Sequence, residues 1–288
     1  MEGDIHMNRD QVITYEPDNS IRKGYWSIFT EILSEIKTNQ WLIYQLFKRD
    51  FFATYKQSFM GVFWALIIPL VSVATFVVLN RSGLFTIGKI DVPYPIYAIL
   101  GLSFWQLFST GLVASSNSLV KAGSMITQIN FSKKSLVFAS AGQSIISFGI
   151  QFLFLMILFL YYQFTPNIAI LFIPVIILPV LFLTLGLGLV LSILNGVIRD
   201  AGNVISLLMT FFMFLTPILY AKPEAGILAK ITEVNLLHYL VSGARDLVLK
   251  GTISEPMGFF ISSLVSLIVF FICLIIFHLT ETRICERV

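Results

Sequence analysis

Charged residues are scarce in this chain of 288 residues: only 12% are Asp, Glu, Lys or Arg, whereas 57% are hydrophobic. The charges that are present cluster, so that long stretches contain none. A soluble domain of this length cannot bury that much apolar surface. The scarcity therefore excludes a soluble globular protein and indicates a chain that crosses a lipid bilayer.

Nucleotide-binding and hydrolytic motifs are also missing. The sequence contains no GxxxxGK[ST] phosphate loop, no HExxH and no GxSxG. We therefore expect no catalytic residue and no bound cofactor in this chain, and we expect its energy to come from another subunit. A transporter driven by protons or sodium ions would place carboxylates or histidines inside the bilayer. Here His278 lies at the end of an apolar stretch and His238 lies outside all of them, which disfavours that class.

Cysteine is rare as well, with Cys273 in an apolar stretch and Cys285 near the C-terminus. Twelve residues of helix would separate the two by about 18 Å, which is too far for a disulfide. Neither has a neighbouring His or Cys at ligand spacing. We therefore expect two free thiols and no metal site.

Six stretches without a formal charge are each long enough to form a membrane helix, at about 20 residues per crossing. They are too long for strands and lack the alternation of a membrane barrel, so helices satisfy the backbone in lipid. The predicted fold class is an all-α integral membrane protein, with residues 1–35 as a cytoplasmic tail and 36–288 as one transmembrane domain. The six predicted helices span residues 58–80, 96–119, 136–163, 168–194, 203–220 and 257–279.

The positions of Lys and Arg predict the orientation. Most of the 19 fall in segments that share one side of the membrane if the N-terminus is cytoplasmic. Because positive residues favour the cytoplasmic side, we predict two cytoplasmic termini and an outer location for residues 221–256. The first 35 residues are polar and lack the apolar run of a signal peptide.

An amphipathic segment directly precedes the first predicted membrane helix. On a helix over residues 41–57, Lys48 and Arg49 share one stripe, whereas Phe47 and Phe51 lie on the opposite face. Such a helix lies in the membrane interface. It either anchors the chain or presents a surface to a cytoplasmic partner, and its residues alone favour the anchor.

Two connecting segments are also open to alternative interpretations. The cytoplasmic loop at 120–135 mixes basic and apolar residues, and it is either a coupling helix that fits a groove of another protein or an ordinary positive loop. The outer segment at 221–256 has apolar residues at helical spacing, which indicates interfacial or re-entrant helices. Arg245 and Asp246 are adjacent there, so on a helix they point apart and need separate partners.

Hydroxyl, amide and aromatic side chains are the functional groups that the membrane helices do contain. For the Ser, Thr, Gln and Asn residues of the second and third helices, we favour a role in helix packing over substrate contact. Aromatic residues of the first and fifth helices either face lipid or line a path along which sugar rings slide. The candidates for such a path are Phe59, Phe63, Trp64, Phe76, Phe211, Phe212, Phe214 and Tyr220.

Over roughly residues 35–288, the sequence resembles the membrane subunits of ABC-2 type polysaccharide exporters, which transport O-antigen, teichoic acid or capsule. The most specific matches stand at the front of the domain, and later ones support them. They are Arg49, Asp50, Tyr55, Lys56, Gln57, Ser58, Gly61, Trp64 and Pro69, followed by Arg199, Asp200, Pro217, Tyr220, Asn235, Arg245 and Gly251. The chain departs from the family pattern at Ser132 and Leu236, where similar proteins often have proline.

The resemblance implies the permease subunit of an ATP-driven exporter in the bacterial inner membrane, with an O-antigen-like lipid-linked polysaccharide as its substrate. It implies a second copy of this chain, two ATP-binding subunits that hold ATP and magnesium, contact with membrane lipid, and no nucleic acid. The first and fifth helices of both copies would line the path. The ATPase subunit would contact Lys48, Arg49, Lys121, Met125, Ile126, Ile129 and Phe131, and outer re-entrant helices would carry Asn235, Arg245 and Asp246.

Two alternatives come from other classes. A membrane-embedded enzyme that acts on lipid-linked sugars would use the outer cluster of His238, Arg245 and Asp246. A channel that needs no ATPase is the weaker alternative, because the three interfacial features would then have no role.

Overall fold

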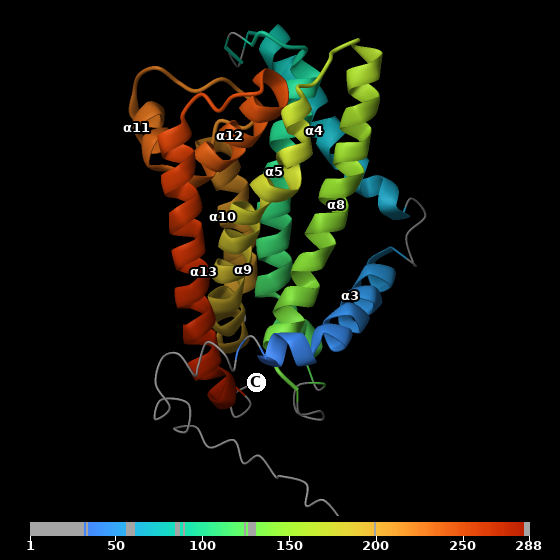
Figure 1. The fold of residues 1–288 in the computed structure, drawn as a ribbon, viewed down its shortest axis with the longest axis vertical. Helices are drawn as coiled ribbons and strands as arrows, with labels where there is room; N and C mark the ends of the chain where they lie inside the picture. The colour runs from blue at the N-terminus through green and yellow to red at the C-terminus, as the bar shows by residue number, and fades with distance from the viewer. Residues whose placement is uncertain are drawn as a thin grey trace, which may run out of the picture.

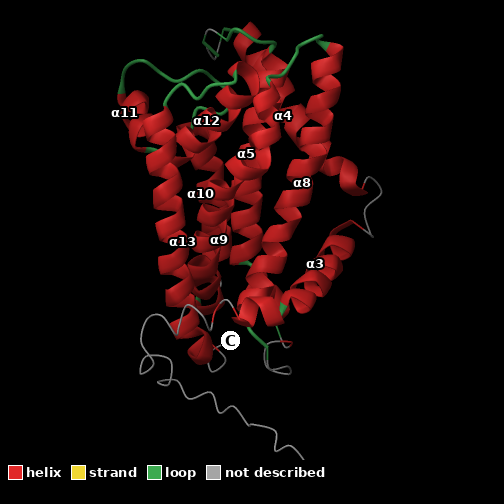
Figure 2. Ribbon diagram, in the orientation of Figure 1, coloured by secondary structure: helices red, strands yellow, loops and turns green. Residues whose placement is uncertain are grey.

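The structure is a computed structural model that describes residues 32, 34–55, 61–83, 87, 88, 90–123, 125, 131–198 and 200–284. Within these ranges the chain consists of helices and their connections, without a strand (Figure 2). The longer helices stand side by side in one bundle (Figure 1). Helix α3 (Gln40–Tyr55) and the last described residues, up to Ile284, lie at one end of it, and α11 (Ile227–Val234) and α12 (Leu236–Lys250) at the other (Figure 1). We call these the α3 end and the α12 end.

Among the described residues, five segments are long and apolar enough to cross a membrane, and they correspond to the first, second, third, fourth and sixth predicted helices. They are α4 (Trp64–Arg81), α5 (Tyr94–Ser116), α8 (Lys134–Tyr161), the 3₁₀ turn η2 (Ile168–Phe172) with α9 (Ile173–Val197), and α13 (Pro256–Ile284). Residues 61–63 of the first predicted helix form a 3₁₀ turn, η1 (Gly61–Phe63), which precedes α4. Residues 58–60 of that prediction lie outside the described residues.

The fifth predicted helix is shorter than residues 203–220, because α10 spans Ala201–Leu215. Thr216 has extended backbone, with φ −106° and ψ 124°. The ring of Pro217 disfavours helical backbone in the residue before it, which ends the helix there. The C-terminal part of that prediction is therefore wrong, and a sixth membrane crossing at α10 stays a prediction.

Shorter helices occupy both ends of the bundle. Helix α3 falls on the predicted amphipathic segment, while its position in a membrane interface stays a prediction. In the loop at 120–135 the structure describes the end of α6 (Ser118–Ala122), and residues 124 and 126–130 lie outside the described residues. At the other end, the Asn235 side chain begins α12 by accepting the Leu237 N–H at 3.0 Å. Gly251 ends the helix with a left-handed φ of 79°.

Helix α5 forms the centre of the bundle. Its residues Leu100, Phe104 and Leu107 are fully buried, and it packs against α8 and α9. A second apolar cluster at the α3 end includes Leu46 of α3 and Phe277 of α13. These two clusters hold the membrane helices together and fix α3 against them.

Candidate functional site

A cleft of about 510 Å³ lies between α4, α5, α8 and α10. Its α4 wall includes Trp64 and Ile68, and its α10 wall includes Ser206 and Met209. The rest of the wall is rich in hydroxyl and amide groups of α5 and α8, with two further residues beyond the end of α5. These are Gln106, Ser109, Thr110, Gln143, Ser144, Ser147, Asn117 and Lys121. We call this site the polar cleft.

Several hydroxyl groups of the polar cleft donate a hydrogen bond to a backbone carbonyl of their own helix. The hydroxyl of Thr110 donates to the carbonyl of Gln106 at 2.5 Å, and that of Ser147 donates to the carbonyl of Gln143 at 3.2 Å. Ser206 does the same with the carbonyl of Gly202 at 2.9 Å. A hydroxyl that donates in this way keeps lone pairs that accept. The wall therefore offers acceptors to a ligand that brings its own hydroxyl donors.

Fixed charge is nearly absent from the polar cleft. Of the described residues that line it, Lys121 alone is charged, and it lies near the α3 end of the cleft. A hydroxyl-rich neutral ligand can exchange hydrogen bonds along such a wall without meeting a strong ionic contact. The arrangement is suited to contact and passage rather than to acid or base catalysis.

Trp64 of α4 lines this cleft, and the aromatic residues predicted to form a path divide into two groups. The exposed ones are Phe63, Trp64, Phe211 and Phe214. Phe76 is buried and stacks on Phe214 with ring centroids 6.4 Å apart, and Phe212 stacks on Trp105 at the same separation. Tyr220 is buried, and its hydroxyl donates to the carbonyl of Phe214 at 2.6 Å. Within this one chain the first group is open to a path or to lipid, Phe212 is half-buried, and Phe59 lies outside the described residues.

At the α3 end, the structure brings the amphipathic helix and the loop at 120–135 together. Nη1 of Arg49 lies 3.4 Å from Sδ of Met125, in a hydrogen bond between residues 76 positions apart. Phe47, Met125 and Phe131 pack against the same apolar cluster. Arg49 also pairs with Asp50 at 2.9 Å, and Lys48 is exposed. We call the surface made by Lys48, Arg49, Met125 and Phe131 the α3 surface; the candidates Ile126 and Ile129 lie outside the described residues.

Directly behind this surface, Lys134 joins three distant segments. It is the first residue of α8 and is 1% exposed. Its Nζ lies 2.6 Å from a carboxylate oxygen of Glu35, which precedes α3, and 2.5 Å from one of Glu281 in α13. Glu281 also accepts the backbone N–H of Lys133. We call Glu35, Lys134 and Glu281 the ionic cluster.

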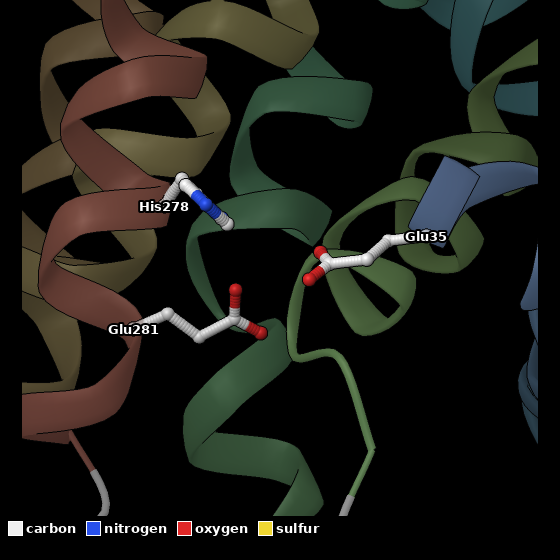
Figure 3. A group of neighbouring side chains, drawn as sticks. All are labelled: Glu35, His278 and Glu281. Carbon is white, nitrogen blue, oxygen red and sulfur yellow. The ribbon is translucent and has the colours of Figure 1, made fainter. Parts of the chain in front are cut away.

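His278 lies beside the ionic cluster, and Figure 3 shows its ring and the two carboxylates turned toward a common space. One potential ligand atom from each of Glu35, His278 and Glu281 lies within 4.8 Å of the others, a spacing that a metal ion could use. However, the ammonium of Lys134 contacts both carboxylates and already supplies the positive charge that they need. The geometry thus assigns these residues to an ion-pair network that connects helices.

Residues 42–249 match the protein family described as ABC-2 type transporter. The chain belongs to this family. The match extends from α3 to α12, so it contains the polar cleft and the α3 surface, and it confirms the resemblance inferred from the sequence.

Relatives of this ABC-2 chain include three proteins named O-antigen export system permease protein RfbA. The protein of that name from Myxococcus xanthus is 26% identical over 190 residues, which cover 66% of this chain and 72% of the relative. Two proteins of Klebsiella pneumoniae with the same name are 25% identical over 218 and 222 residues, covering 74% of this chain and 82% of each relative.

His238, Arg245 and Asp246, which the sequence predicts to lie on the outer side of the membrane, line a second, smaller cleft at the α12 end of this ABC-2 chain. Arg245 donates to the carbonyls of Ile218 and Pro217, each at 3.2 Å, and its guanidinium lies 3.8 Å from the centroid of the Tyr97 ring. Asp246 instead pairs with Lys250 at 3.3 Å. The two adjacent residues thus have separate partners, as their spacing predicts. Arg245 supports the turn after α10 rather than facing a substrate.

The sequence does not separate the polar residues that line the cleft from those that pack helices. Ser103, for example, is fully buried and donates to the carbonyl of Ile99, whereas Thr110 in the same helix is open to the cleft. Gln106, Thr110, Val113 and Asn117 recur every three or four residues, which places them on one face of a helix, but the buried Ser103 continues the same spacing. That face lines the cleft.

Proposed function

We propose that this chain is the membrane-spanning permease of an ATP-driven exporter that moves a lipid-linked polysaccharide of the O-antigen class across the bacterial inner membrane. Membership of the ABC-2 family supports the transport role, and the names of the relatives support the substrate class. Two copies would enclose the path, each with one ATP-binding subunit, and both termini would be cytoplasmic. The observation that carries the proposal is the polar cleft, whose wall includes the exposed ring of Trp64 and has no carboxylate among the described lining residues.

The chemistry of the cleft suits a polymer of sugars. Its hydroxyl oxygens and amides can pair with sugar hydroxyls, which both donate and accept. The ring face of Trp64 offers apolar contact to the C–H faces of sugar rings. Because almost no charge is present, no single position would hold the polymer strongly. The wall therefore favours sliding contact over tight binding.

Under this proposal, force enters at the α3 surface. ATP binding would close the partner subunits and displace the loop that contains Met125, together with α3, to which Arg49 ties it. Lys134 follows this loop directly and is bound to Glu35 and Glu281, so a displacement of the loop would be carried into α8 and α13 together. Because α8 borders the polar cleft, this displacement would move one wall of the cleft.

A bulky residue in the cleft tests this function. We expect Thr110→Trp to reduce polysaccharide export at least tenfold, because the side chain fills the cleft, while the ATPase subunit still co-purifies with the permease. Leu153→Trp is the matched control, because Leu153 lies on α8, is 68% exposed and is not part of the cleft wall. Unchanged export by the Thr110→Trp protein would contradict the role of the cleft. Purified chain that exports polymer without any ATPase subunit would contradict the ATP-driven mechanism.

The enzyme alternative rests on the meeting of His238, Arg245 and Asp246 in one cleft. It predicts that the purified chain alone converts lipid-linked sugars and that Asp246→Asn abolishes this turnover. Under the export proposal no such conversion occurs, and Asp246→Asn leaves ATP hydrolysis by the complex intact. Mass spectrometry of the lipid-linked sugars before and after incubation separates the two outcomes.

A further inference from the structure

The cleft at the α12 end, which we call the α12 cleft, is built mainly on one face of a single helix. His238, Ser242, Arg245 and Asp246 of α12 lie at positions i, i+4, i+7 and i+8 of the helix and line the cleft. Tyr97 of α5 and Lys222 lie among the other lining residues. The cleft encloses about 250 Å³. This volume is below the roughly 300–1,000 Å³ of sites for drug-sized ligands and suits a group of about one ring.

His238 is the unexplained polar group of the α12 cleft. Its side chain belongs to a residue that is only 4% exposed, and neither ring nitrogen has a hydrogen-bond partner among the described residues. Burial, with a smaller effect from Lys222, lowers the pKa of His238 to about 4, so the ring is neutral at physiological pH. A neutral imidazole has one nitrogen that donates and one that accepts. Leaving each buried group unpaired costs about 1–3 kcal/mol, which points to a ligand that supplies both partners.

Of the six charged residues that line this cleft, four form two ion pairs with one another, and the other two are Asp91 and Arg245. Lys222 contacts Glu255 at 2.5 Å, and Lys250 contacts Asp246 at 3.3 Å. Arg245, which is 3% exposed, donates to two backbone carbonyls. An anionic ligand would have to compete with Glu255 and Asp246 for these cations. A neutral ligand with hydroxyl groups avoids that competition and can both donate to and accept from His238.

We propose that the α12 cleft binds one ring of a neutral sugar, with His238 as the group that recognises its hydroxyls. The cleft is continuous with the end of α10, because Pro217 and Lys222 line it and Tyr97 donates to the carbonyl of Tyr220 at 3.1 Å. A polymer that moves along α10 therefore arrives at this site. The identification of the sugar as part of the exported polymer rests on the proposed function, whereas the binding of a sugar does not.

Saturation-transfer NMR on the full-length chain in lipid nanodiscs tests this site directly. The probes are D-glucose, D-galactose, D-mannose and N-acetyl-D-glucosamine, each at millimolar concentration, with inorganic pyrophosphate as the anionic comparison. We expect transfer to at least one sugar and a loss of affinity of tenfold or more in His238→Phe, which keeps a ring but has no nitrogen. His238→Gln keeps a donor and an acceptor and should lose less than tenfold. Val234→Phe is the control, because Val234 is exposed at the same end but is not part of the cleft wall.

Three results would overturn the proposal. They are no transfer to any of the four sugars, equal affinity in wild type and His238→Phe, and tighter binding of pyrophosphate than of every sugar. The Gln variant keeps the test decisive if the Phe variant does not fold. Because the assay contains no ATPase subunit, sugar binding without export would contradict the proposed function alone. Export without sugar binding would contradict this inference alone.

Discussion

The ionic cluster at the α3 end offers the sharpest test of how this chain is held together. Lys134→Met keeps most of the side-chain volume but removes the ammonium that faces Glu35 and Glu281. The two carboxylates are then left close together, with side chains that are only 17% and 11% exposed. Breaking a buried ion pair in this way costs about 3–5 kcal/mol. Because the carboxylates keep some contact with solvent, we expect a loss near the lower limit, about 3 kcal/mol.

The measurement is the free energy of unfolding of the purified chain in mixed micelles, titrated with SDS and followed by circular dichroism. Lys250→Met is the matched control. Lys250 also pairs with a carboxylate, but its side chain is 56% exposed, so we expect a loss of no more than about 1 kcal/mol. In the triple variant Lys134→Met, Glu35→Gln, Glu281→Gln the uncompensated charges are gone, and we expect most of the lost stability to return.

The reasoning fails if Lys134→Met is no more destabilising than Lys250→Met, since the cluster would then behave as a surface pair. It also fails if the triple variant is less stable than Lys134→Met alone. In that case the cost would come from lost packing or lost hydrogen bonds, such as the one that Glu281 accepts from the Lys133 N–H, rather than from unpaired charge.

Two further predictions concern other parts of the bundle. In Gly186→Ala the new Cβ would lie 2.7 Å from Cα of Phe270, so α9 and α13 must move apart at a cost of about 1–3 kcal/mol. In the control Gly149→Ala the new Cβ meets no atom within 4 Å and should not destabilise the chain. Equal midpoints of SDS unfolding for the two variants would contradict this packing. In the folded chain the pKa of His238 is about 4, below the ordinary 6.5. Between pH 6.5 and pH 4 the unfolded state therefore binds more protons than the folded state. The free energy of unfolding should fall by about 3 kcal/mol as the pH decreases from 6.5 to 4. Unfolding of wild type and His238→Gln at pH 7, 6 and 5 checks this, and an identical pH dependence in both would refute it.

The sequence predicts the membrane helices well because lipid imposes a simple rule on them. A charged residue inside the bilayer is costly, so a run without charge marks a crossing, and five such runs coincide with long apolar helices. The differences lie at helix ends, where local backbone decides. Pro217 ends α10 five residues before the predicted limit, and a 3₁₀ turn at Gly61–Phe63 precedes α4 within the first predicted helix. Composition is insensitive to both effects.

The contacts between side chains could not be predicted from the composition of the sequence, for a different reason. Lys133 and Lys134 look alike in the sequence, yet only the side chain of Lys134 pairs with Glu35 and Glu281, which lie 99 and 147 residues away. Such partners depend on how α13 and the segment before α3 rotate against α8. The same holds for the contact of Arg49 with Met125. Local periodicity places a residue on one face of its helix, but the packing of the whole bundle decides what that face meets.

The distribution of charge limits how this ABC-2 chain can be driven. In the described parts of its long helices, the charged residues lie close to helix ends, such as Arg81, Lys134 and Glu281. Under the proposed function, the force for the motion therefore enters from outside the apolar bundle and not through a change of charge inside the bilayer. The α3 end is suited to receive it, because the Arg49–Met125 contact and the ionic cluster tie α3, the loop at 120–135, α8 and α13 to one another. The polar cleft has Lys121 as its one charged residue among the described lining residues, and the α12 cleft lies at the opposite end of the bundle from the ionic cluster. Under the proposed function, the energy input and the contact with sugar are therefore separated along the bundle axis.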